Sequence, residues 1–165
     1  MKLSRSSTCF AFAIVLHMLA FSANAQESLD SNTQVEASIL QSKVKGFFRD
    51  LTDKTVGADQ AVRADQAVQA LVANGPLKER SEELTKLIEQ AARLEQRYGA
   101  YTGNEPVDAK AIGSDLLRLR FLYKAEKFPI VWQFTFYRTQ DTAGNKRDWS
   151  LIALKFDTQL DAVMR

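Results

Sequence analysis

Cysteine and histidine are almost absent from this chain, and the two that occur, Cys9 and His17, both lie within the first 25 residues. Without cysteine in the remainder, a disulfide scaffold, a thiolate nucleophile and a cysteine metal site are excluded there. Without histidine, a Ser-His-Asp triad and a histidine-bound zinc are excluded as well. Residues 26–165 must therefore work through carboxylates, cations, hydroxyls and aromatic rings, and we expect neither a metal nor a cofactor.

A surplus of charge is lacking too. The whole chain has a net charge of +2. Removal of the first 25 residues takes away Lys2 and Arg5 and reduces the 22 Lys and Arg residues to 20. This number equals that of the Asp and Glu residues, which is also 20. A neutral chain lacks the basic field that dominates affinity for nucleic acid. We therefore expect no nucleic-acid partner.

The first 25 residues predict a secretory signal peptide. A basic start is followed by an apolar run over residues 9–21 and by an Ala-Asn-Ala cleavage site at residues 23–25. The alternative is a transmembrane anchor, which needs about 20 apolar residues, more than this run has. We expect cleavage after Ala25 and a secreted or periplasmic protein with no membrane segment after cleavage. The 140 residues that remain of the 165 are enough for one domain.

The first half of the remaining chain predicts helices. Residues 26–33 are polar and are expected to form a disordered N-terminus, followed by a single domain over residues 34–165. Apolar spacings of three and four residues predict helices over about 34–54, 58–73 and 77–98. Thr33 and Glu36 have the spacing of a capping box. The positions expected to face the core are Val35, Ile39, Leu40, Val44, Phe47, Phe48 and Leu51 in the first helix and Val62, Val68, Leu71 and Val72 in the second.

In the last third of the chain the apolar period changes to two, which predicts β-strands. The expected strands cover residues 107–112, 116–124, 128–138 and 149–156. Because the connections are short, we expect an antiparallel meander, with strand 128–138 between strands 116–124 and 149–156. The fold class is therefore α+β, with about three N-terminal helices packed on one face of a curved antiparallel four-stranded sheet.

Strand 128–138 carries the heaviest side chains and has two distinct faces. Its large apolar residues are expected to form the core: Ile130, Trp132, Phe134 and Phe136. Its other face carries Gln133, Thr135 and Tyr137. We expect any function of this strand to lie on the second face.

Three helices followed by an aromatic antiparallel sheet, from about Val35 to Phe156, resemble the nuclear transport factor two-like superfamily, which includes ketosteroid isomerase and the SnoaL-type polyketide cyclases. The ending is similar to that of small secreted bacterial proteins of unknown function, with Trp-Gln-Phe-Thr-Phe-Tyr-Arg at residues 132–138, then Trp149, Phe156-Asp157 and Leu160. The resemblance implies a cone-like, cystatin-like roll. In that roll the helices and one sheet face enclose a pocket, and the other face often forms a homodimer. No activity comes with it.

Five polar residues are candidates for lining a ligand pocket or a partner interface: Arg118, Arg120, Gln133, Thr135 and Tyr137. Arg118 and Arg120 point the same way from one strand, about 6.5–7 Å apart. If buried, they need an acidic ligand or carboxylates to compensate them. Exposure at a sheet edge is the simpler alternative. The favoured function is binding of a small ligand or a protein partner without catalysis, with a homodimer as one such assembly.

The alternative function is a cofactor-independent isomerase or cyclase, in which a carboxylate and a tyrosine in the cone act on the substrate. The candidate groups near strands are Asp108, Asp115, Asp157, Tyr98, Tyr101, Tyr123 and Tyr137. None falls in a motif of the family, so no catalytic residue is assigned. A structural component of the bacterial envelope is a third hypothesis.

Two further sets of residues have a structural and a functional interpretation. Trp132 and Trp149 can stack on a flat ligand, but large aromatic residues at strand period are more often core. Asp50 and Asp53 lie one helical turn apart near a helix end, which suggests a cation site. Two carboxylates do not complete a Ca²⁺ shell of about six to eight oxygens, so we expect a solvated helix end.

Overall fold

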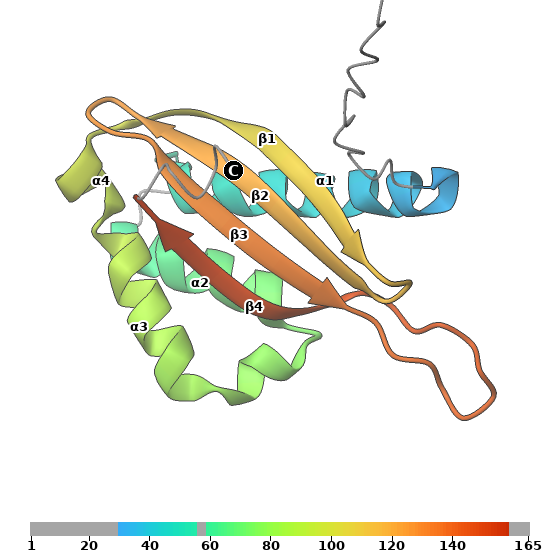
Figure 1. Ribbon diagram of the computed structural model, residues 1–165. Coiled ribbons are helices and arrows are strands. Elements are labelled where there is room, and N and C mark those ends of the chain that lie inside the picture. Colours follow the sequence, from blue (N-terminus) through green and yellow to red (C-terminus); the bar gives the residue numbers. More distant parts are fainter. Residues whose placement is uncertain (1–29, 56–58, 159–165) are drawn as a thin grey trace, which may run out of the picture.

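The computed structural model describes residues 30–55 and 59–158, in which all helices precede all strands. The helices are α1 (Ser31–Thr52), α2 (Gln60–Val72), the 3₁₀ turn η1 (Pro76–Glu79), α3 (Ser81–Ala92) and α4 (Leu94–Tyr98). The strands are β1 (Tyr101–Ile112), β2 (Leu116–Ala125), β3 (Ile130–Tyr137) and β4 (Ser150–Asp157). The helices lie behind one face of a curved, open sheet (Figure 1), which confirms the predicted α+β class.

The predicted signal peptide, residues 1–25, lies outside the described residues, as do residues 26–29. Ser31, Asn32 and Thr33 belong to α1. Within the described part of the chain, no helix combines the length and the apolar character needed to cross a bilayer.

The sheet is a meander with the strand order β1-β2-β3-β4, and every neighbouring pair is antiparallel. The prediction that the heavy third strand lies inside the sheet is therefore confirmed. Phe134 pairs with Leu119 of β2 and Leu154 of β4, and these three side chains share the face toward the helices. The next row along the strands, Arg120, Gln133 and Lys155, faces the opposite side.

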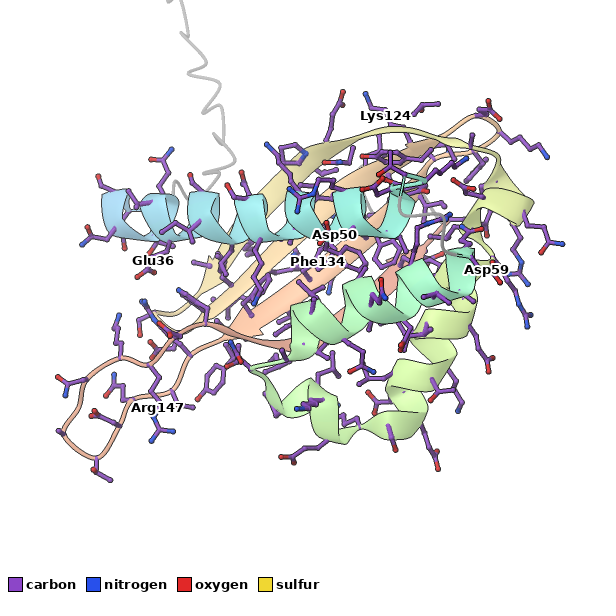
Figure 2. All side chains as sticks on the ribbon, turned by 180° about the vertical axis from the view of Figure 1, so that it is seen from behind. Glu36, Asp50, Asp59, Lys124, Phe134 and Arg147 are labelled. Atoms are coloured by element: carbon purple, nitrogen blue, oxygen red, sulfur yellow. The ribbon has the colours of Figure 1, made fainter. Side chains whose placement is uncertain are left out.

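The core is an aromatic layer between α1 and the inner face of the sheet. The Phe48 ring centroid lies 5.7 Å from that of Trp132 and 5.9 Å from that of Phe134, and both contacts are edge-on. Trp132, Phe134 and Phe121 are completely buried. Figure 2 shows Phe134 on the side of the sheet that α1 and α2 cover. The space between helices and sheet is thus filled by aromatic rings.

The N-terminus of α1 differs from the prediction. Asp30 is the N-cap, and its Oδ1 accepts a hydrogen bond from the Thr33 backbone N–H at 2.7 Å. A carboxylate at the N-cap satisfies an unpaired helix N–H as a threonine would, and it also favours the positive end of the helix dipole. The Thr33–Glu36 capping box is therefore wrong, and the Glu36 carboxylate binds Arg138.

The apolar stripe of α1 is narrower than predicted. Its buried positions are Ala37, Leu40, Val44, Phe47, Phe48 and Leu51. Val35 and Ile39 are 62% and 64% exposed, because they lie on an adjacent stripe of the helix that does not face the sheet. Val62 of α2 is also exposed, since Ala64, Ala67 and Val68 form the buried side of that helix. These three residues were wrongly expected in the core.

The predicted helix over residues 77–98 is divided into three pieces. Pro76 starts the 3₁₀ turn η1, where its missing N–H costs nothing. Arg80 and Arg93 then leave the helical conformation, with φ/ψ of −93°/65° and −100°/2°. The break at Arg93 redirects the chain so that Leu94 is buried at 1% exposure. Gly99, at φ +86°, ends α4 as predicted.

Both edges of the sheet are protected from further strand pairing. The pairing of β1 shifts register between Tyr101 and Gly103 and again between Pro106 and Asp108, and Pro106 has no N–H to offer another strand. The edge of β4 is approached by the segment leading into η1, where a Cβ added to Gly75 would lie 2.7 Å from the Leu151 carbonyl oxygen. These features block edge-to-edge association.

Candidate functional site

All five predicted site residues lie on the outer face of the sheet, opposite the described helices. The pairing of β2 with β3 places Arg118 beside Thr135 and Arg120 beside Gln133. Tyr137 lies at the end of the same face, beside Leu116, and is 41% exposed. The structure therefore brings the five residues together in one patch, away from the helix–sheet interior.

The Arg118–Arg120 pair is compensated by a carboxylate from the neighbouring strand. Asp108 of β1 accepts a hydrogen bond from Arg120 Nε at 2.9 Å and a second from Arg120 Nη2. Arg118 Nη2 lies 3.6 Å from the same Asp108 oxygen, Oδ2. The hydrogen bond with Asp108 raises the pKa of the Arg120 guanidinium. The two alternatives for the arginine pair were burial with compensation by acidic groups and exposure at a sheet edge. The structure lies between them, because the pair is half-buried and shares one internal carboxylate, that of Asp108.

The outer face carries more positive than negative charge at its centre. One cross-strand row is Lys110, Arg118, Thr135 and Ala153, and the next is Asp108, Arg120, Gln133 and Lys155. These two rows hold four cations and one carboxylate. We call them the basic rows. The adjoining row of the outer face carries two carboxylates, Glu105 and Asp157, of which Glu105 binds Lys124.

The groups needed by the enzyme alternative are dispersed. Asp108 lies on the outer face, Asp115 lies in the β1–β2 turn, and Asp157 ends β4. On the inner face, Tyr123 packs against Tyr101 with ring centroids 4.8 Å apart, and Asn104 donates a hydrogen bond to the Tyr101 hydroxyl. Within residues 30–55 and 59–158, neither Asp108 nor Asp115 shares a hydrogen bond with a tyrosine hydroxyl. The isomerase or cyclase function stays a prediction.

Tyr123 supplies a test of this part of the core. Burial, together with the nearby Glu95 carboxylate, raises the pKa of the Tyr123 hydroxyl above its usual value of 10.0. The folded protein therefore keeps this proton at a pH where the unfolded chain has lost it. The stability that Tyr123 contributes is complete below about pH 10 and falls as the pH rises further. Urea denaturation from about pH 8 to about pH 11 should show a shallower decline for Tyr123→Phe than for the wild type. Equal declines would contradict the buried hydroxyl.

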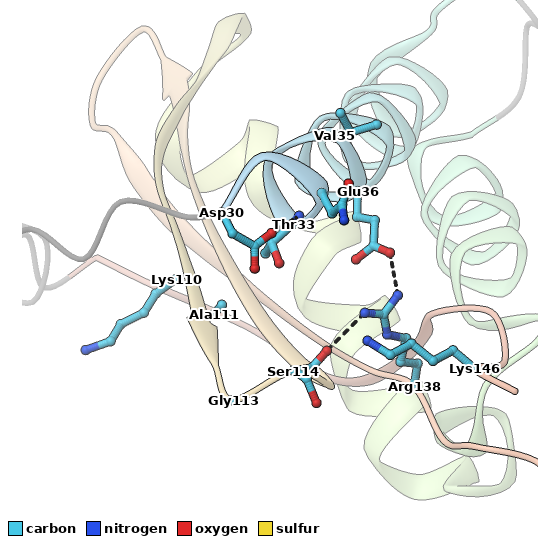
Figure 3. A pocket seen from close by; sticks show the side chains of 11 residues that line it. Asp30, Thr33, Val35, Glu36, Lys110, Ala111, Gly113, Ser114, Arg138 and Lys146 are labelled. Carbon is cyan, nitrogen blue, oxygen red and sulfur yellow. Dashed lines mark hydrogen bonds and ion pairs between the residues drawn. The ribbon is translucent and has the colours of Figure 1, made fainter. Parts of the chain in front are cut away.

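A second polar centre lies near the N-terminal end of α1, where the β3–β4 connection begins. The side chain of Arg138 is only 9% exposed, and its guanidinium binds the Glu36 carboxylate of α1 and the Ser114 carbonyl oxygen, the latter at 3.0 Å (Figure 3). Its Nε lies 3.5 Å from Asp115 Oδ1, and its carbon Cζ lies 4.5 Å from the centre of the Trp149 ring. Arg138 thus joins α1, the β1–β2 turn and the β3–β4 connection.

Two adjoining concavities meet at Arg138. One, of about 810 Å³, lies between the first turn of α1 and the β1–β2 turn. The other, of about 970 Å³, lies between α1 and residues 138–150 and is called the α1 groove below. The lining of the α1 groove consists of Glu36, Ile39, Leu40, Lys43, Asn74, Arg138, Thr139, Lys146, Arg147, Asp148, Trp149 and Ser150. Of these residues, the sequence pointed to a binding role only for Trp149, whose ring can stack on a flat ligand.

The two tryptophans and the two α1 aspartates considered as ligand or cation sites contact other side chains of the protein. Trp132 is core, whereas Trp149 is half-buried beneath the Arg138 guanidinium. Asp50 binds Arg49, and Asp53 accepts hydrogen bonds from Thr55 at the end of α1. In the described ranges, no three metal-binding side chains come together.

Comparison of the chain with protein-family models, with curated proteins and with solved structures gives no match. The likeness to the nuclear transport factor two-like superfamily therefore stays a prediction.

Proposed function

We propose that this chain is an exported binding domain without catalytic activity, which contacts an acidic surface of a protein partner through the outer face of its sheet. The basic rows carry the proposal, because they place four cations and one carboxylate on a face that the described helices leave open. Asp108 is occupied by Arg118 and Arg120, so it offers little to a basic partner. Lys110 and Lys155 are exposed on either side of the arginines.

The charge of the basic rows favours an acidic partner over a second copy of the chain. Two copies stacked through this face would bring like charges together, which costs free energy at a desolvated interface. The homodimer stays a prediction, and native mass spectrometry of residues 26–165 tests it. A dimer that dissociates when Thr135 is replaced by arginine would favour the second copy.

The acidic-partner proposal can be tested with poly-L-glutamate as a probe. We expect residues 26–165 to bind it in biolayer interferometry, with an affinity that falls as salt rises. The double variant Arg118→Glu/Lys155→Glu should weaken binding about tenfold or more, equivalent to about 1.4 kcal/mol. A full loss of binding would support the same conclusion.

The matched control is Lys86→Glu/Arg97→Glu, which makes the same change of charge on α3 and α4, away from the sheet's outer face. Apart from the general effect of net charge, which the two double variants share, this variant should bind poly-L-glutamate with the affinity of the wild type. If both double variants lose the same affinity, binding follows net charge alone and the outer face is not the site. Retained binding in Arg118→Glu/Lys155→Glu would also refute the proposal.

The isomerase or cyclase alternative gains no support from the inner face of the sheet. The side chains there are aromatic and aliphatic, and their rings occupy the space in which the resemblance places a pocket. We therefore favour binding over catalysis.

A further inference from the structure

We propose that the α1 groove binds a small organic anion that carries an aromatic or branched apolar group. This site is separate from the basic rows of the sheet, and its residues come from α1, the turn after α2, the β3–β4 connection and the start of β4. Figure 2 shows Glu36 and Arg147 on the two elements, α1 and the β3–β4 connection, that flank the groove.

The apolar part of the ligand would contact Ile39 and Trp149. Ile39 is 64% exposed although it is a large aliphatic residue, and it lies on the groove side of α1. Trp149 offers an indole that is only partly buried, and Leu40 continues the apolar surface toward the core. Burial of these side chains by a ligand is favourable because it removes apolar surface from water.

The charge around the groove favours an anion. Glu36 is neutralised by Arg138, so the carboxylate left on the lining is Asp148. Three further cations line the same groove: Lys43, Lys146 and Arg147. Neither Lys43 nor Arg147 has an ion-pair partner in the described residues, and Lys146 lies 3.9 Å from Asp115. These cations are available to a carboxylate, sulfonate or phosphate group.

An unpaired donor supplies a second observation. Trp149 Nε1 is buried and has no hydrogen-bond acceptor among residues 30–55 and 59–158. A buried N–H without an acceptor is unfavourable, so an acceptor that reaches it would be bound favourably.

The size and composition of the groove limit the ligand class. A volume of about 970 Å³ is suited to a small molecule, since ligand sites are commonly about 300–1,000 Å³. Nine of the twelve lining residues are polar or charged. An acyl chain needs a mainly apolar surface, so the lining favours a compact anion over a lipid tail.

The test uses two probes with nearly the same rings and different charge. 8-Anilinonaphthalene-1-sulfonate carries a sulfonate, and N-phenyl-1-naphthylamine is its uncharged counterpart. With residues 26–165 we expect the sulfonate to bind at least about tenfold more tightly than the amine, which corresponds to about 1.4 kcal/mol. Energy transfer from tryptophan to the bound sulfonate should fall in Trp149→Phe, while Trp132 remains as the second donor.

The variant that removes the anion contacts is Lys146→Gln/Arg147→Gln. It should weaken the sulfonate about tenfold or more and leave the uncharged amine unchanged within about twofold. Lys86→Gln/Arg97→Gln, with the same loss of charge on α3 and α4, is the matched control and should bind both probes as the wild type does. Circular dichroism of each variant confirms that the fold is retained.

Three results would overturn the proposal. Equal affinity for the two probes would mean that charge does not select the ligand. An equal effect of the two double variants would mean that net charge, and not the groove, governs binding. Co-sedimentation with phosphatidylglycerol vesicles that is lost in Lys146→Gln/Arg147→Gln, without any loss of sulfonate affinity, would assign these cations to a membrane surface.

Discussion

Phe134→Ala is expected to lower the free energy of unfolding by about 3–5 kcal/mol, the range for removal of a buried phenylalanine side chain. Phe134 is completely buried, and its ring lies 5.9 Å from the rings of both Phe47 and Phe48 of α1. Its loss leaves a cavity between the helix and the central strand that neighbouring rings fill only in part. Urea denaturation followed by circular dichroism measures the change.

Phe128→Ala is the matched control, because it removes the same ring from a position that is 39% exposed. It should cost less than about 1 kcal/mol. A loss below about 1 kcal/mol for Phe134→Ala would mean that the inner face of β3 is assigned to the wrong side.

Arg138→Met is the second substitution with a large expected effect, a loss of about 3 kcal/mol. This is the lower end of the range for breaking a buried ion pair, chosen because Glu36 is still 29% exposed. Methionine retains much of the apolar stem but leaves Glu36 and Asp115 without their shared cation. It also removes the cation–π contact with Trp149. The same denaturation experiment measures the loss.

A double-mutant cycle with Glu36→Gln separates the ion pair from the packing. Glu36→Gln should destabilise the wild type more than it destabilises Arg138→Met, because in the second background its partner is already gone. Lys124→Met, which removes the cation of the exposed Lys124–Glu105 pair, is the control and should cost less than about 1 kcal/mol. Independent effects of Glu36→Gln and Arg138→Met would show that the pair does not couple α1 to the sheet.

The sequence predicts the fold wherever a periodic pattern matches a buried face. The alternation of Trp132, Phe134 and Phe136 with polar residues predicts both the interior position of β3 and the orientation of its two faces. Phe47 and Phe48 identify the buried side of α1 for the same reason. Two patterns mislead. Val35 and Ile39 fit a broad helical stripe, but in the first turns of α1 only a narrower stripe, which includes Ala37 and Leu40, is buried. The helix over 77–98 has an unbroken apolar pattern, yet Arg80 and Arg93 leave the helical conformation to place Leu84 and Leu94 in one core.

The sequence predicts the outer-face site better than it predicts the contacts around Arg138. Residues on neighbouring strands, such as Arg118 and Thr135, are brought together by the alternation and the short turns, which the sequence shows. Asp108 is harder to assign, because its position opposite Arg120 depends on a bulge at Pro106. The Glu36–Arg138 contact joins residues 102 positions apart, and no local pattern specifies such a partner. The one available signal was Arg138 itself, a guanidinium placed directly after the most apolar strand of the chain.

The long-range Glu36–Arg138 pair also bears on the order in which the chain folds. Strands β1 and β2, and β2 and β3, meet after short turns, whereas this pair closes a loop of 102 residues, and loop-closure entropy rises with loop length. We therefore expect the pair to form after the sheet has assembled and α1 has docked. A contact absent from the transition state affects the rate of unfolding and leaves the rate of folding nearly unchanged. The joining of α1 to the β3–β4 connection would then set the lifetime of the native state, and with it the persistence of the groove between them.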